Sequence, residues 1–189
     1  MLQMSMKLLE SDRLILRELR GGDAERVERY ANDEEINRYL IFGDLARRPG
    51  AEKYVAQAMQ NATLPLYERR SFKLAILLKK EDANFIGSCW LDIAEKAHRR
   101  ATVGYFIDKA YWGRGYAGEA LAALLQFGFE TLGLHRIEAT CDADHKATRR
   151  VLEKGGLTRE ARLRQHRPRQ NGWSDSILYA IVEKDSATP

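Results

Sequence analysis

Residues 105–121 read YFIDKAYWGRGYAGEAL. This order of residues predicts a β-strand, a glycine-bearing turn and the first turn of an amphipathic helix. Glycines let the backbone approach a ligand closely, and the free N–H groups at the start of a helix attract anions. The segment therefore predicts a cradle for phosphate groups.

Three glycines of this segment also have the G-x-G-x-x-G spacing of dinucleotide-binding proteins. They are Gly113, Gly115 and Gly118, and Glu138 follows about 20 residues later. In that motif the first glycine follows its strand almost at once, whereas residues 109–112 intervene here. Glu138 also falls inside the next predicted strand rather than at its end. Nicotinamide or flavin binding is therefore a lesser alternative, as is a glycine turn with a purely structural purpose.

The chain as a whole predicts one mixed α/β domain over residues 1–189, with its core at about 8–184. Strands are expected at 13–19, 72–78, 85–93, 102–107, 135–141, 158–165 and 176–183. Helices are expected at 21–31, 49–61, 117–132 and 146–154. The apolar segment Tyr39–Gly43 predicts a lid or a substrate wall, and Pro168–Trp173 predicts the connection between the last two strands.

The composition is that of an ordinary folded protein, with 189 residues, 44% hydrophobic, 31% charged and a formal net charge of +4. The sequence contains neither a run of 18 apolar residues nor a secretory signal, so we expect a cytoplasmic protein without a membrane span. Cys89 and Cys141 lack the spacing of metal ligands or redox pairs. Both are expected to be reduced and buried, and no metal is expected.

Seven arginines gather between residues 149 and 169. Such a cluster suits an anionic cofactor, an acidic partner or a solvated surface. Direct binding of nucleic acid is not expected, because no zinc-finger, RRM or helix-turn-helix pattern accompanies the charge.

Further motifs accompany the glycine turn. Residues 11–17 read SDRLILR, residues 86–88 read IGS, and VGY at 103–105 precedes WGRGYAGEA at 112–120. With these motifs the chain, from Ser11 to Tyr179, resembles the GNAT superfamily of N-acetyltransferases, in its Rim-type branch of ribosomal-protein-alanine N-acetyltransferases. The resemblance implies a central mixed, mostly antiparallel sheet of about seven strands, flanked by about four helices and splayed at the fourth and fifth strands.

The resemblance also implies acetyl-CoA as the acetyl donor. Main-chain N–H groups from Arg114 to Gly118 would bind the pyrophosphate, and the strand edge at 106–108 would pair with the pantetheine amides. The implied cofactor-binding residues are Phe106, Ile107, Asp108, Gly113, Arg114, Gly115, Tyr116, Ala117, Gly118, His145 and Thr148. Trp112 stands where most of the superfamily has glutamine or arginine.

The catalytic positions of the superfamily are only partly preserved. Thr102 replaces the usual glutamate base, and Asp92 and Glu138 are the nearest carboxylates on predicted strands that could replace it. The branch's N-x-x-S motif aligns with His145 to Thr148, and the Thr148 hydroxyl is the candidate donor to the leaving thiolate. A tyrosine found in many other members is Leu152 here.

These features predict transfer of acetyl from acetyl-CoA to a primary amine. A protein α-amino group, that of a ribosomal protein by resemblance, is the favoured acceptor, because it is neutral at lower pH than a lysine and needs less help from a base. The alternatives are a small-molecule amine (an amino acid, polyamine or antibiotic) and a non-catalytic CoA-binding regulator. Either a monomer or a homodimer is expected.

Overall fold

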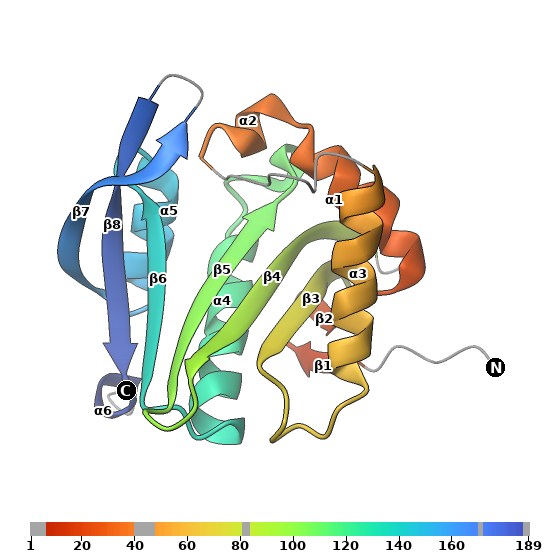
Figure 1. Cartoon of the computed structure of the whole chain (residues 1–189), viewed down its shortest axis with the longest axis horizontal. Coiled ribbons are helices and arrows are strands. Elements are labelled where there is room, and N and C mark those ends of the chain that lie inside the picture. Colours follow the sequence, from red (N-terminus) through yellow and green to blue (C-terminus); the bar gives the residue numbers. More distant parts are fainter. Residues whose placement is uncertain (1–6, 40–47, 81–83, 170–171, 187–189) are drawn as a thin grey trace.

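The computed structural model describes residues 7–39, 48–80, 84–169 and 172–186. Its strands form one sheet in the order β1-β2-β3-β4-β5-β6-β8-β7 (Figure 1). The strands are β1 (Lys7–Glu10), β2 (Leu14–Glu18), β3 (Ser71–Leu78), β4 (Asn84–Glu95), β5 (Arg100–Ile107), β6 (Arg136–Asp142), β7 (Thr158–Arg169) and β8 (Gly172–Val182). The helices are α1 (Ala24–Ala31), α2 (Glu34–Asn37), α3 (Arg48–Ala62), α4 (Tyr116–Gln126), α5 (Lys146–Lys154) and α6 (Glu183–Ser186). Three shorter turns are η1 (Gly21–Asp23), η3 (Lys109–Tyr111) and the π-helical η4 (Phe127–Thr131).

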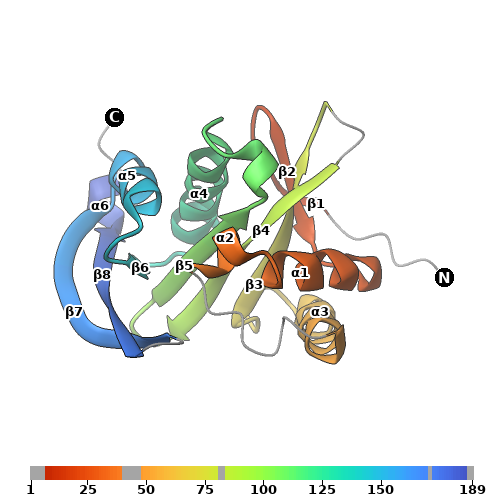
Figure 2. The same ribbon diagram turned by 90° about the horizontal axis from the view of Figure 1, so that it is seen from above.

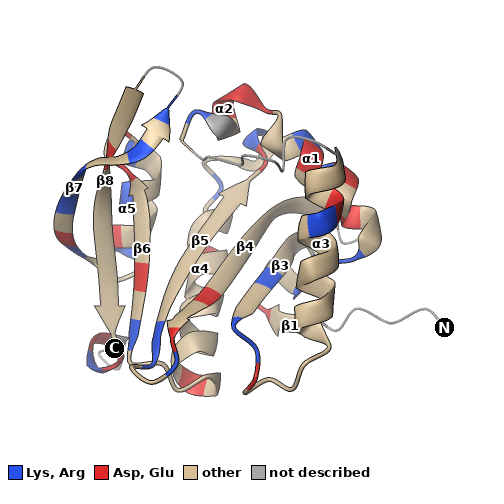
Figure 3. Ribbon diagram, in the orientation of Figure 1, with Lys and Arg blue, Asp and Glu red and all other residues tan. Residues whose placement is uncertain are grey.

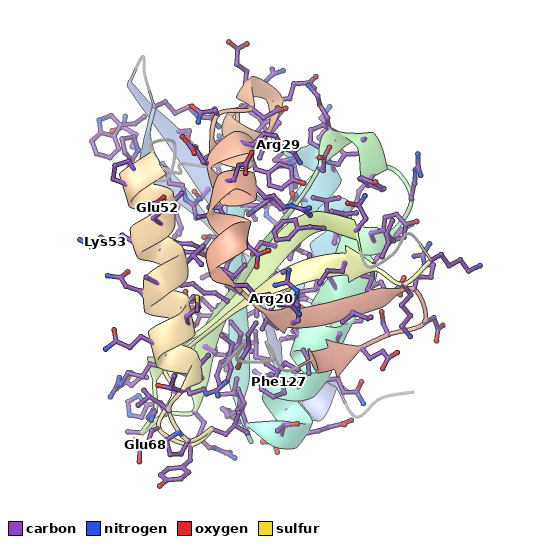
Figure 4. The ribbon with its side chains drawn as sticks, turned by 90° about the vertical axis from the view of Figure 1, so that its right-hand side faces the viewer. Arg20, Arg29, Glu52, Lys53, Glu68 and Phe127 are labelled. Atoms are coloured by element: carbon purple, nitrogen blue, oxygen red, sulfur yellow. The ribbon has the colours of Figure 1, made fainter. Side chains whose placement is uncertain are left out.

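Helices cover both faces of the sheet, α1 and α3 on one side and α4 and α5 on the other (Figure 2). Successive side chains of a strand point to opposite faces. Leu77 of β3 therefore belongs to the apolar cluster of α1 and α3, whereas its neighbour Ile76 belongs to the larger cluster that includes α4. Figure 4 looks onto the first of these layers, in which Glu52 and Lys53 are exposed on α3. The expected GNAT-type fold is confirmed.

The hydrogen-bonded ladder between β5 and β6 is incomplete. These neighbours run parallel and pair at only three positions, from Arg100 with Arg136 to Thr102 with Glu138. Beyond Thr102 the two strands diverge toward α2 (Figure 1). The splay expected at the fourth and fifth predicted strands therefore lies at β5 and β6, and it leaves their facing backbone edges outside the hydrogen-bonded ladder.

Two features of the sheet differ from the expectation. Residues 7–10 add a short edge strand to β2, which raises the number of strands to eight. The connection between the last two strands lies within the predicted Pro168–Trp173 but is shorter, because β7 continues to Arg169 and β8 begins at Gly172. Pro168 is compatible with a strand here because β7 lies at the sheet edge, where one side of the strand carries no ladder bonds.

Two predicted helices also differ in detail. The helix expected at 21–31 begins with the 3₁₀ turn η1, and the helix expected at 117–132 is α-helical only to Gln126. It continues as η4, in which a Cβ on Gly128 would lie 2.6 Å from the Ile137 side chain of β6. The π-helical turn thus coincides with a close approach of this segment to the sheet. The segment expected as a lid, Tyr39–Gly43, lies outside the described residues except for Tyr39.

A buried ion pair fixes the start of α1. Arg17 of β2 and Asp23 of η1 are 8% and 5% exposed, and their side chains make two hydrogen bonds of 2.7 and 2.9 Å. The Asp23 carboxylate also accepts a hydrogen bond of 2.7 Å from the Arg20 N–H. Because buried charges require such partners, this pair is a strong structural constraint on the chain between β2 and α1.

Within the described ranges, no helix has both the length and the apolar character needed to cross a bilayer. The same residues contain no group of three or more His, Cys, Asp or Glu side chains placed to hold a metal ion. Cys89 and Cys141 are both buried and unpaired.

Candidate active site

A cavity of about 900 Å³ lies at the splay between β5 and β6. Its wall includes side chains from both faces of the sheet, because Tyr105 belongs to the α4 side and Phe106 to the α1 side. On the α1 side, Trp90 lies directly over Gly104, where a Cβ would come within 2.1 Å of the indole ring. The cavity is therefore lined from both sides of the sheet, by α4 and α5 on one side and by α2 on the other.

The glycine turn has the geometry of an anion cradle. Gly113 and Gly115 have φ angles of +74° and +83°, which residues with a Cβ rarely adopt. The first ladder bond of α4 runs from the Glu119 N–H to the Gly115 carbonyl, 3.1 Å away. The N–H groups of residues 116–118 precede that bond and have no carbonyl partner within the helix. Of the predicted cradle, the cavity wall includes Gly113, Gly115, Tyr116 and Ala117 but not Arg114 or Gly118.

Glu119 braces this cradle against the turn between β1 and β2. Its carboxylate accepts hydrogen bonds from Ser11 Oγ at 2.7 Å, Arg13 N at 2.8 Å and Arg13 Nε at 2.6 Å. Arg13 also donates to the Arg114 carbonyl at 3.0 Å and lies over the Tyr116 ring. Burial acts to raise the pKa of Glu119, but the bonds from Ser11 and Arg13 outweigh it and hold that pKa below its usual value. The sequence alone indicates an acid favoured by the helix dipole and does not identify these partners.

The strand edge expected to bind pantetheine is partly engaged within the protein. The Trp112 indole donates to the Ile107 carbonyl at 2.7 Å, and the Asp108 N–H donates to the Ile86 carbonyl at 2.7 Å. The Asp108 carboxylate accepts from the Ala110 N–H, and Asp108 is absent from the described cavity wall. Phe106 and Ile107 line the cavity, so the available edge is shorter than the expected 106–108.

Basic side chains line the cavity at α5. They are Lys146, Arg150 and Lys154. Arg149 is directed elsewhere, with hydrogen bonds to the Tyr179 hydroxyl at 3.4 Å and the Ala143 carbonyl at 3.5 Å. The positive charge beside the helix start suits phosphate groups.

The other five arginines of the cluster all lie on β7, which carries blue segments in Figure 3. Three of its arginines have partners on neighbouring strands. Arg162 pairs with Asp175, Arg167 donates to Thr140, and Arg169 pairs with Asp142. These contacts tie β7 to β6 and β8.

The two candidate bases are placed differently, and only Glu138 reaches the cavity. It lies beside Thr102 in the last pair of the β5–β6 ladder. Its carboxylate accepts hydrogen bonds from Arg100 at 3.2 Å and Arg136 at 2.8 Å. Both bonds end on Oε1, so this carboxylate is ion-paired with two guanidinium groups rather than isolated.

Asp92 is not brought to the cavity wall as the described residues define it. It stands opposite Thr102 in the β4–β5 register, where it accepts a hydrogen bond from Ser71 and pairs with Lys73 at 3.7 Å. These contacts suit a structural carboxylate better than a base.

His145 and Thr148, at the start of α5, both line the cavity. The His145 ring stacks on Tyr39 with 4.0 Å between ring centroids, which joins α5 to the end of α2 across the splay. Burial lowers the pKa of His145, against an opposing effect of Asp142. The neutral form of the imidazole is therefore favoured, and the ring makes an aromatic contact with Tyr39.

Tyr105 lines the cavity, although the sequence indicates it only as part of the Val103–Tyr105 motif. Its hydroxyl is buried and has no hydrogen-bond partner in the described parts of the chain. The strand alternation contained a signal, since it places residue 105 on the face that α5 covers.

Taken together, the cavity fits the coenzyme A group that the resemblance implies. The helix-start N–H groups and the basic α5 wall suit phosphates, and the edge of β5 suits an extended amide chain. Thr148 and Tyr105 place two hydroxyl groups where the cavity crosses the sheet.

Comparison with known proteins identifies the family. Residues 13–158 match the family described as "Acetyltransferase (GNAT) domain". YoaA of Bacillus subtilis, an uncharacterized N-acetyltransferase, is 32% identical over 176 residues, which cover 93% of this chain and 97% of YoaA. The ribosomal protein uS5-alanine N-acetyltransferase of Escherichia coli is 23% identical, over 94% of this chain and 91% of that protein.

Solved structures give the same result. A GNAT-family acetyltransferase from Bacillus anthracis has a TM-score of 0.78 at 27% identity, covering 93% of this chain and 98% of its own. RimJ of Mycobacterium smegmatis, solved in complex with CoA-disulfide, has a TM-score of 0.77 at 26% identity, covering 93% and 84%. The chain therefore belongs to the GNAT family and is an acetyl-CoA-dependent N-acetyltransferase.

Proposed function

We propose that the acceptor is the α-amino group of a protein N-terminus, with ribosomal proteins as the favoured group. Membership of the family makes the chain an enzyme, so the alternative of a non-catalytic CoA-binding regulator no longer applies. The observation that carries the proposal is the state of the carboxylates near the splay. Glu138 is held by Arg100 and Arg136, and Asp142 by Arg169.

Such a site favours an amine that is already neutral. The pKa of an α-amino group is about 8 and that of lysine about 10.4, so at pH 8 about half of the α-amines but well under about 1% of lysines are unprotonated. Because arginines engage the carboxylates of Glu138 and Asp142, an α-amine, which has the larger unprotonated fraction, is the favoured acceptor. The branch resemblance and the uS5-alanine relative support the same acceptor.

In this proposal the cradle residues hold the donor and α5 serves the leaving group. Main-chain N–H groups at 114–118 bind the pyrophosphate, and Lys146 and Arg150 neutralise phosphate charge. Thr148 donates a hydrogen bond to the departing sulfur. Glu138 takes part only as a positioned charge, and Asp92 has no direct role.

The acceptor is tested with a peptide that has a free N-terminus and one internal lysine. We expect acetyl on the α-amine alone, and kcat/KM that rises about tenfold per pH unit below pH 7 and levels off above about pH 8, as the α-amine ionises. Mass spectrometry locates the acetyl group, and thiol release gives the rates. The Nα-acetylated peptide is the control.

Either of two results would reject the α-amine acceptor. One is acetylation of the Nα-acetylated control peptide at the same rate as the free peptide, which would identify lysine as the acceptor. The other is a small amine, such as spermidine or a free amino acid, with kcat/KM at least about 100-fold above that of every peptide tested.

Replacement of Thr148 by alanine tests the leaving-group side. We expect kcat to fall by about 10- to 100-fold, because the sulfur loses its donor, while KM for acetyl-CoA stays within about threefold. Thr148→Ser keeps the hydroxyl and should retain most of the activity. If the alanine variant turns over like the wild type, Thr148 has only a structural role at the start of α5.

A further inference from the structure

The Tyr105 hydroxyl is an unusual group for a protein interior. It is buried, and among the described residues it has no hydrogen-bond partner. An unpartnered buried hydroxyl destabilises a fold, so its retention calls for an explanation. The Tyr105 residue lines the same cavity as Thr148, Val151 and Leu152 of α5.

Tyr179 shows how the same fold treats another buried tyrosine. Its side chain is completely buried, yet its hydroxyl donates to Glu153 at 2.7 Å and accepts from Arg149 at 3.4 Å. Among the described residues, one buried phenol is thus fully partnered and the phenol of the cavity residue is not. This contrast indicates that the partner of Tyr105 is formed only during the reaction cycle.

Thr148 is the neighbour through which Tyr105 can act. Burial raises the pKa of Tyr105, and the nearby Thr148 hydroxyl acts in the opposite direction without meeting the geometry of a hydrogen bond. The phenol therefore keeps its proton at neutral pH. Both hydroxyl groups can rotate, and each can donate and accept. One turn along α5 from Thr148 the side chain is Leu152, which offers no hydroxyl.

We propose that Tyr105 is a positioning residue that orients the Thr148 hydroxyl toward the leaving sulfur and restores its proton. The proposal rests on acetyl transfer and on the donor role of Thr148, not on which amine is the acceptor. As the amine nitrogen bonds to the thioester carbonyl carbon, the carbon–sulfur bond breaks and the sulfur keeps its electron pair. Thr148 gives a proton to the sulfur, and Tyr105 gives one to Thr148. The nitrogen releases a proton to solvent, and after CoA has left, Tyr105 recovers its proton from solvent through the Thr148 hydroxyl, whose side chain lines the cavity.

The test compares Tyr105→Phe with Tyr179→Phe. For Tyr105→Phe we expect kcat to fall about 10-fold or more, with KM for acetyl-CoA within about threefold and Tm unchanged or higher, because the variant loses an unpartnered group. For Tyr179→Phe we expect the reverse, a lower Tm with unchanged kcat, because that hydroxyl is partnered. A purely structural role for Tyr105 would not separate the two variants in this way.

A double variant shows whether Tyr105 acts through Thr148. If it does, Tyr105→Phe combined with Thr148→Ala should be no more than about threefold slower than Thr148→Ala alone, since residues that act as a unit are not additive. A double variant whose loss of kcat equals the product of the two single-variant losses would overturn the coupling. Unchanged kcat in Tyr105→Phe, or a loss confined to acetyl-CoA affinity by calorimetry, would overturn the proposal.

Thiol release is followed with the best amine acceptor and, separately, with water as acceptor, because both reactions require the same sulfur to leave. Wild-type turnover in the same assays distinguishes failure of the Tyr105 proposal from failure of the proposed α-amine acceptor. A wild type that acetylates peptides while Tyr105→Phe is unaffected rejects only the role of Tyr105. A wild type that uses only small amines rejects only the proposed acceptor.

Discussion

Replacement of Gly115 by glutamate is expected to weaken CoA binding by at least about 100-fold, or about 2.7 kcal/mol. Gly115 has φ +83° and immediately precedes α4. A side chain there is strained, would approach the Arg13 guanidinium, and would place a negative charge beside N–H groups that attract anions. Calorimetric titration with CoA measures the affinity, and circular dichroism verifies that the variant is folded.

Gly133→Glu is the matched control. Gly133 has φ +61° with open space around it, and it lies outside the cavity wall given by the described residues. That variant carries similar backbone strain and the same charge, so CoA affinity should be unchanged. If folded Gly115→Glu still binds CoA within about threefold of the wild type, the glycine turn is not the phosphate site.

Asp23→Ala is expected to lower the free energy of unfolding by about 3–5 kcal/mol, because it leaves the Arg17 guanidinium buried without its partner. Urea denaturation followed by circular dichroism gives the value. The site lies outside the cavity wall as described, so CoA affinity of the folded variant should be close to that of the wild type.

An exposed pair provides the comparison. Glu95 and His98 are in contact at 3.0 Å with side chains that are 48% and 65% exposed. Glu95→Gln should therefore change stability by less than about 1 kcal/mol. If Asp23→Ala costs no more than Glu95→Gln, the Arg17–Asp23 pair is not a constraint on the start of α1.

The cradle and the layered fold follow from rules that act over short stretches of chain. Glycines at positive φ, the helix start after them and the alternation along β5 are each written within a few residues. Prediction of the strand splay rested on resemblance, because the three-position ladder of β5 and β6 depends on where two distant strands diverge. β1 went unrecognised because a four-residue edge strand carries almost no alternating pattern.

The partners of polar groups were beyond the reach of the sequence. Whether Glu138 is a free base or a bound one depends on Arg100 from another strand. The indole of Trp112 donates a hydrogen bond to the Ile107 carbonyl. The hydroxyl of Tyr105 has no hydrogen-bond partner among the described residues. Such properties arise from tertiary packing, which residue type and spacing do not encode.

The brace between Glu119 and the Ser11–Arg13 turn also has a thermodynamic consequence. It connects residues 106 positions apart in the chain, so the phosphate cradle is coupled to the turn that joins the edge strand β1 to its neighbour β2. A ligand that binds only the braced cradle must then stabilise β1 and β2 by mass action. The acetyl donor thus protects the N-terminal border of the sheet, and loss of order at that border lowers the donor's affinity.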